Sequence, residues 1–159
     1  ALGANPRLKA IVIGFSNNEV SDHFRALIAD DPSRERVIQH EFANLPRLNE
    51  LYNASDVVVF GNGSISCQAA LGTGLTACLA DNGSMNHLIT QPEQGYFFTM
   101  FDVGDLARAI AEATTAIGRR TGQARLEARL AMARGAAWLG YDQIIRTVIE
   151  KATPMVRLS

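Results

Sequence analysis

The chain has 159 residues, of which 47% are hydrophobic and 19% are charged, and its formal net charge is −1. This length suits one domain or one half of a larger enzyme, and the high apolar content excludes a disordered chain. The balanced charge gives no bulk attraction to nucleic acid or to a membrane surface, and no apolar run reaches the roughly 18 residues of a membrane span.

Cysteine and lysine are both scarce. Cys67 and Cys78 are the only cysteines, which is too few for a disulfide framework, and we expect both to be buried as small apolar residues. Only Lys9 and Lys151 are lysines among the 15 basic residues. We expect no metal site and no bound cofactor. Since no secretory signal pattern is visible, we expect a cytoplasmic protein.

Short apolar runs alternate with segments of helical periodicity along the whole chain. The apolar, β-branched composition predicts strands at residues 8–15, 36–42, 57–60, 76–80 and 95–98. The spacing of apolar side chains predicts helices at residues 19–30, 46–54, 64–72, 85–89, 103–117, 123–138 and 141–151. This order predicts an α/β fold: a Rossmann-like, doubly wound parallel sheet with helices on both faces and a helical C-terminal tail. No linker or repeat interrupts it, so we predict a single domain over residues 1–159.

Three polar loops follow predicted strands, at residues 16–18, 61–64 and 81–84. In an open parallel sheet, ligands bind at the carboxyl ends of the strands. The loop at residues 61–64, Gly-Asn-Gly-Ser, is the most suggestive, because glycines let a ligand approach the backbone and a helix begins directly after them. Such a loop can hold a phosphate without lysine. The alternative is an ordinary helix cap at a tight strand–helix turn.

The candidate substrate-binding residues cluster in and after two of these loops. They are Gly61, Asn62, Gly63, Ser64, Ile65, Ser66, Gln68, Asn82, Gly83, Ser84 and His87. The serines can donate hydroxyl hydrogen bonds, and a neutral-range pKa suits His87 to acid–base work or to binding a diphosphate. His23 and His40 are more typical of a surface or core edge, and no catalytic residue is identified.

Arginines are frequent in the last predicted helices. Arg119, Arg120, Arg125, Arg129 and Arg134 form this run. It predicts the solvated face of a helix. Because Arg125 and Arg129 are four residues apart, they fall on one stripe and could instead meet a partner domain.

Several ordered segments resemble retaining GT-B glycosyltransferases of the glycogen-synthase and mannosyltransferase group. Residues 50–59 (ELYNASDVVV) are similar to the "ELY-x-x-(A/S)-D-V-x-V" segment of that family, and residues 70–75 (ALGTGL) to its "A-M-x-x-G-x-P" turn. Residues 102–110 (DVGDLARAI) are similar to its "D-x-x-x-L-A-x-A-I" ending, and residues 8–14 to its "L-x-I-V-G" strand. The set covers most of the chain in the family's order.

The resemblance implies the C-terminal, nucleotide-sugar-binding half of a two-domain glycosyltransferase. An N-terminal acceptor-binding domain and the first strand and helix of this half, with their diphosphate-binding Arg and Lys, would then be missing from the chain. The implied function is binding of a nucleotide-diphosphate sugar for transfer of the sugar to an acceptor. We expect no nucleic-acid partner and no transmembrane segment; the missing domain could give peripheral attachment to the inner membrane.

The chain departs from the family at its carboxylates. Aligning residues 72–74 with the family turn places its two glutamates, one for the sugar and one for the ribose, at Gly61 and Ala69. The glutamate of the third loop corresponds to His87, and Gln68 could partly substitute for the one at Ala69. A second hypothesis follows, in which the chain is a catalytically silent glycosyltransferase-like domain that acts in assembly or ligand sensing.

Overall fold

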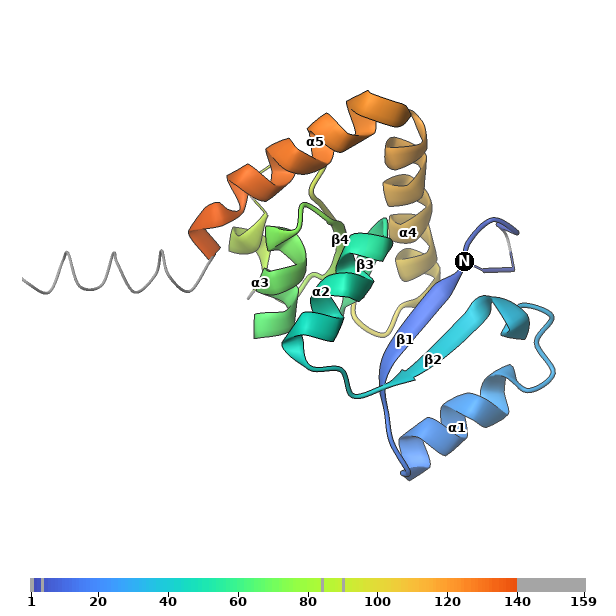
Figure 1. Cartoon of the computed structure of the whole chain (residues 1–159). Coiled ribbons are helices and arrows are strands. Elements are labelled where there is room, and N and C mark those ends of the chain that lie inside the picture. Colours follow the sequence, from blue (N-terminus) through green and yellow to red (C-terminus); the bar gives the residue numbers. More distant parts are fainter. Residues whose placement is uncertain (1, 4, 84, 90, 140–159) are drawn as a thin grey trace, which may run out of the picture. The chain divides into compact units, whose positions relative to one another are not determined.

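The computed structural model describes residues 2–3, 5–83, 85–89 and 91–139 (Figure 1). Contacts between residues divide the chain into two compact units, residues 1–48 and residues 49–159. The boundary falls inside helix α2, Leu45–Ala54. A single domain over residues 1–159 stays a prediction, and the helix predicted at 141–151 lies outside the described residues.

The first unit is built around a parallel β–α–β element. Its strands and helices are β1 (Ala10–Phe15), α1 (Glu19–Ile28), the single 3-10 turn η1 (Arg34–Arg36) and β2 (Val37–Glu41). Strands β1 and β2 pair in parallel, with Ala10 opposite Val37. The register shifts after Ile13, where Gly14 adopts a φ of 102° that only glycine tolerates well.

The polar loop after β1 works as a helix cap. Asn18 precedes α1, and its side-chain oxygen accepts a hydrogen bond from the N–H of Ser21 at 2.9 Å. The helix is then fixed on the sheet by the rings of Phe15 and Phe24, which meet edge to face with centroids 5.2 Å apart. The loop at residues 16–18 therefore has a local structural role.

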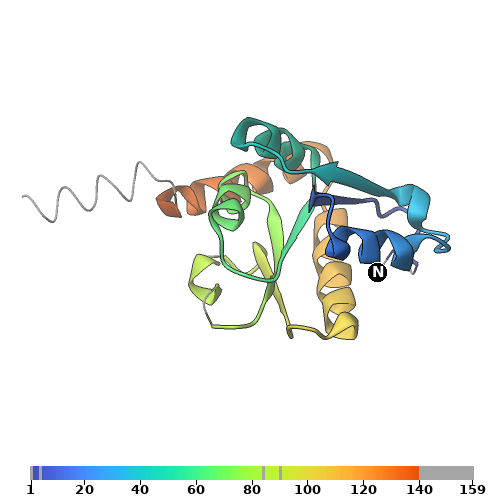
Figure 2. The same cartoon turned by 90° about the horizontal axis from the view of Figure 1, so that it is seen from below.

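The second unit contains a three-stranded parallel sheet. From α2 onward its elements are β3 (Val57–Phe60), α3 (Ile65–Gly72), β4 (Thr76–Ala80), the 3-10 turn η2 (Asn86–Leu88), β5 (Gly95–Phe98), α4 (Val103–Gly118), α5 (Gly122–Gly135) and the 3-10 turn η3 (Ala137–Leu139). The strands pair in the order β3–β4–β5. Helix α4 lies along one side of this sheet and α3 along the other (Figures 1 and 2). The predicted α/β class, with parallel strands flanked by helices, is confirmed.

The core of the second unit is centred on β4, whose five residues are all buried. A middle strand covered on both faces needs mainly apolar side chains, and the four residues after Thr76, Ala-Cys-Leu-Ala, meet that need. Cys67 and Cys78 belong to this core, as predicted, and neither is exposed. Burial raises the pKa of the Cys67 thiol to about 11 and that of Cys78 to about 12.

The turn between α3 and β4 depends on glycine. The N–H of Gly74 donates to the carbonyl oxygen of Leu71 at 2.9 Å and closes the end of the helix. Gly74 has a φ of 75°. A Cβ built on it would lie 2.1 Å from the carbonyl oxygen of Arg129, so the turn packs directly on the backbone of α5.

Several predicted elements differ in extent from those observed: α1 ends at Ile28 instead of residue 30, and β2 spans Val37–Glu41 instead of residues 36–42. The helix predicted at 85–89 is only the single turn η2. Helix α5 ends at Gly135 instead of continuing to residue 138, because the chain tightens there into η3. The first strand begins at Ala10, where pairing with β2 begins.

Candidate functional site

Three loops of the second unit lie at one edge of its sheet. Because β3, β4 and β5 are parallel, their last residues, Phe60, Ala80 and Phe98, end at the same edge. The loops that follow begin at Gly61, Asp81 and Thr99. The sequence predicted the first two as ligand loops and missed the third.

The loop after β3 leads directly into α3. Ser64 has extended backbone angles, and its hydroxyl oxygen accepts a hydrogen bond from the N–H of Cys67 at 3.2 Å. Ser64 is therefore the N-cap of α3, which fits the helix-cap interpretation. The first turn of α3 contains no acidic residue, so the partial positive charge of this helix end is not neutralised within that turn.

The side chains at the start of α3 differ in their exposure to solvent. Ile65 is exposed, whereas Ser66 and Gln68 are half-buried. The hydroxyl of Ser66 shares a hydrogen bond with that of Tyr52, a residue of α2. Burial raises the pKa of Tyr52, and this hydrogen bond opposes the rise. Ser66 thus links α3 to α2, which the sequence did not indicate.

The loop after β4 is tied to both neighbouring elements. The N–H of Asp81 donates to the carbonyl oxygen of Phe98 at 2.8 Å, and the Asp81 carboxylate accepts a hydrogen bond from the Asn86 side chain at 3.2 Å. Gly83 has a φ of 74°, and His87 is exposed on η2. Ser84 lies outside the described residues. An exposed carboxylate, Asp81, and an exposed imidazole, His87, therefore lie on this loop and the turn that follows it.

The loop after β5 is a third part of this edge. The N–H of Asp102 donates to the carbonyl oxygen of Thr99 at 3.1 Å, and Asp102 caps α4 by accepting from the N–H of Asp105 at 2.9 Å. Asp105 in turn accepts from the N–H of Thr99, the main cause that lowers its pKa. The Met100 methyl carbon lies 3.5 Å from the position of a Cβ on Gly61, so this loop contacts the loop after β3.

The sequence carried a signal for this third loop. Residues 95–98 were predicted as a strand, and a parallel strand beside β4 must end at the same edge. Met100 and Phe101 were missed as candidate site residues, because two apolar residues directly after a strand are typical of a buried core. We define the carboxyl-edge site as the loops at residues 61–64, 81–83 and 99–102 together with the first turn of α3.

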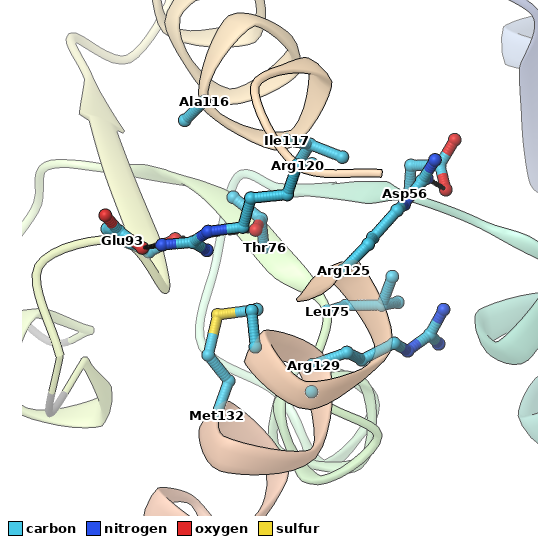
Figure 3. A pocket seen from close by; sticks show the side chains of 12 residues that line it. Asp56, Leu75, Thr76, Glu93, Ala116, Ile117, Arg120, Arg125, Arg129 and Met132 are labelled. Atoms are coloured by element: carbon cyan, nitrogen blue, oxygen red, sulfur yellow. Dashed lines mark hydrogen bonds and ion pairs between the residues drawn. The ribbon is translucent and has the colours of Figure 1, made fainter. Parts of the chain in front are cut away.

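A pocket lies near the opposite, amino edge of the same sheet (Figure 3). Asp56 precedes β3, Thr76 begins β4, and Glu93 precedes β5. Two ion pairs join residues that line this pocket: Arg120 binds Glu93, and Arg125 binds Asp56. Leu75, Ile117 and Met132 form apolar lining. This pocket is separate from the predicted ligand loops.

The prediction that the arginine run forms only a solvated helix face is wrong for Arg129. Arg129 is half-buried, and its guanidinium donates to the carbonyl oxygens of Tyr52 at 2.9 Å and Thr73 at 3.0 Å. It also donates to the carbonyl oxygen of Ser55 at 3.1 Å. Desolvation lowers its pKa. Arg129 satisfies the last carbonyls of α2 and the end of α3, so it serves the fold of the chain itself.

Within the described part of the chain, no three His, Cys, Asp or Glu side chains are placed to hold a metal ion together. No helix there has the length and apolar content of a membrane span. The absence of a cofactor stays a prediction.

The fold and the edge loops define a Rossmann-like α/β protein whose candidate ligand site lies at the carboxyl ends of its strands. The chain is similar to the catalytic domain of cholesterol-α-glucosyltransferase from Helicobacter pylori, with a TM-score of 0.54 and 14% sequence identity. The match covers 82% of this chain and 97% of that domain. No protein-family model and no curated protein matches the sequence. The comparison supports a glycosyltransferase-like fold.

Proposed function

We propose that the chain is the donor-binding part of a glycosyltransferase and binds a nucleotide-diphosphate sugar at the carboxyl-edge site. The observation that carries the proposal is the capped N-terminus of α3, which follows Gly61–Gly63 directly and has no acidic residue in its first turn. Backbone N–H groups at such a helix end bind phosphate oxygens and favour their negative charge. The fold likeness to a glycosyltransferase catalytic domain supports this choice of ligand.

In the proposed reaction, the bond between the sugar C1 and the diphosphate oxygen breaks, and a bond forms between C1 and an acceptor hydroxyl oxygen, whose proton passes to the departing diphosphate or to water. The departing diphosphate carries the developing charge, and the N–H groups at the start of α3 that the Ser64 side chain does not cap would stabilise it. Asp81, on the loop after β4, and His87, on η2, are both exposed and would hydrogen-bond sugar hydroxyls. The acceptor would bind to a further domain.

A specific observation favours the silent-domain alternative. Gly61 and Ala69 stand where the family resemblance expects glutamates, and neither side chain can accept a hydrogen bond from a hydroxyl group. In that case the carboxyl-edge site would bind a nucleotide without supporting transfer.

The direct test is titration calorimetry of the chain with UDP, GDP and their sugars. A Gly63→Val variant crowds the phosphate approach, and we expect it to weaken nucleotide binding at least tenfold, which corresponds to about 1.4 kcal/mol. His23→Ala, on the exposed face of α1, is the control and should bind as the unmodified chain does. Equal effects of the two substitutions would reject the loop assignment. Binding without any sugar transfer or hydrolysis in the presence of acceptors would favour the silent domain.

A further inference from the structure

Phe101 is the one non-glycine residue with a positive φ among the residues that the structure describes, at 67°. Its side chain is also 95% exposed. A bulky residue in the left-handed region is strained, and an exposed aromatic ring gains almost nothing from burial within the chain.

The turn that holds Phe101 explains the strain. The N–H of Asp102 donates to the carbonyl oxygen of Thr99, so Phe101 occupies the third position of a four-residue turn. A positive φ at the third position is the mark of a type II turn, where glycine or asparagine is favoured. The turn is firmly built, because Asp105 binds the N–H of Thr99 at 2.7 Å. Strain that the surrounding structure maintains is a feature of ligand sites.

The neighbours of Phe101 place it at the carboxyl-edge site. Met100, the preceding residue, contacts Gly61 of the proposed phosphate loop. Asp102 ends the same loop and Asp105 lies in the first turn of α4, and their carboxylates disfavour a phosphate there. The part of a nucleotide sugar that suits an uncharged aromatic ring beside a methionine thioether is therefore its planar base.

We propose that Phe101 is a substrate-binding residue whose ring stacks on the base of a nucleotide held by its diphosphate at Gly61–Ser66. This rests on the proposed function. In this turn the Phe101 ring is exposed and available to the ligand instead of buried in the core. The positive φ of Phe101 is the backbone strain that accompanies this exposed position.

The test compares nucleotides with a ligand that lacks a base. UDP, GDP and inorganic pyrophosphate are titrated by calorimetry into the full chain and into a Phe101→Asn variant, since asparagine tolerates a positive φ. Loss of stacking should weaken UDP and GDP binding roughly 5- to 150-fold and leave pyrophosphate binding within twofold. Phe101→Tyr keeps a ring and should retain nucleotide affinity. Phe42→Asn removes a comparably exposed ring from the first unit and should change nothing.

Each other outcome overturns the stacking proposal in a distinguishable way. If the unmodified chain binds neither nucleotides nor pyrophosphate, the proposed function fails and the stacking proposal fails with it. If Phe101→Asn binds nucleotides as well as the unmodified chain, stacking is wrong and the donor site stands. An equal loss for pyrophosphate and nucleotides would show that the ring only shapes the loop. Thermal melts confirm folding, and Phe101→Asn should melt no lower than the unmodified chain because strain is relieved.

Discussion

A side chain at Gly74 would collide with the backbone of α5, whereas one at Gly72 would meet nothing within 4 Å. The two glycines lie two residues apart at the end of α3, and the sequence alone does not distinguish them. Gly74 has the left-handed backbone angle, and Gly72 is the last residue of the helix. The need for glycine is therefore specific to one position of the turn.

We expect Gly74→Ala to lower the free energy of unfolding by about 2–5 kcal/mol, the sum of the left-handed backbone cost and overpacking against Arg129. Gly72→Ala should stay within about 1 kcal/mol of the unmodified chain, in the stabilising direction, because alanine favours a helix. Urea unfolding followed by circular dichroism measures both. A Gly74→Ala variant as stable as Gly72→Ala would show that the turn and α5 are not in contact.

Two arginines attach helix α5 to the rest of the second unit, and we expect them to contribute unequally to the free energy of unfolding. Arg129 is half-buried and donates to carbonyl oxygens at the ends of α2 and α3. Arg125, one turn earlier, makes an ion pair with Asp56 in which both side chains are largely exposed. Exposed ion pairs contribute little, whereas several hydrogen bonds from a partly buried charge to backbone carbonyls contribute more.

We expect Arg129→Met to cost about 2–4 kcal/mol of unfolding free energy, because it removes the guanidinium hydrogen bonds to the carbonyl oxygens of Tyr52, Ser55 and Thr73. Arg125→Met keeps the same aliphatic length and should cost at most about 1 kcal/mol. Adding 1 M salt should weaken the effect of Arg125 further, since exposed charges are screened. Chemical denaturation at low and high salt tests the pair, and equal losses would contradict the capping role of Arg129.

The reactivity of the two cysteine thiols is a probe of the unfolding of the whole second unit. Cys67 lies on α3 and Cys78 on β4, and both are fully buried. Burial raises their pKa values to about 11 and about 12, above the ordinary value of 9.0. Since the folded state holds these protons more tightly than the unfolded state does, the thiols favour folding below pH 9, and this contribution is lost as pH rises toward the folded pKa values.

At pH 8 we expect neither thiol to react with iodoacetamide on the timescale of a free cysteine. Reaction requires a thiolate and access, and the fold denies both. In increasing urea, both should become reactive together at the unfolding midpoint, and that midpoint should fall between pH 8 and pH 10. Mass spectrometry of the alkylated chain follows the two sites separately. Early labelling of either thiol would show that the core opens locally.

Local chemistry was enough for most elements and for part of the site. The apolar run at 76–80 predicted a strand covered on both faces, and the Gly-Asn-Gly-Ser segment predicted a helix start that the Ser64 cap confirms. These features depend on neighbours in sequence, whose spacing is directly visible. The end of α5 was less predictable, because a helix and a following 3-10 turn have similar local patterns.

Only the tertiary structure decided which distant residues meet. Arg129 reaches the carbonyl oxygen of Thr73 across 56 positions of the chain, so its role could not be inferred from helical spacing. Met100 contacts Gly61 because β5 and β3 flank β4 in one parallel sheet. The sequence by itself determined the strands, the helices and the glycine-rich loop. Strand pairing and packing determined the rest of the carboxyl-edge site, because those contacts form between segments whose separation along the chain carries no periodic signal.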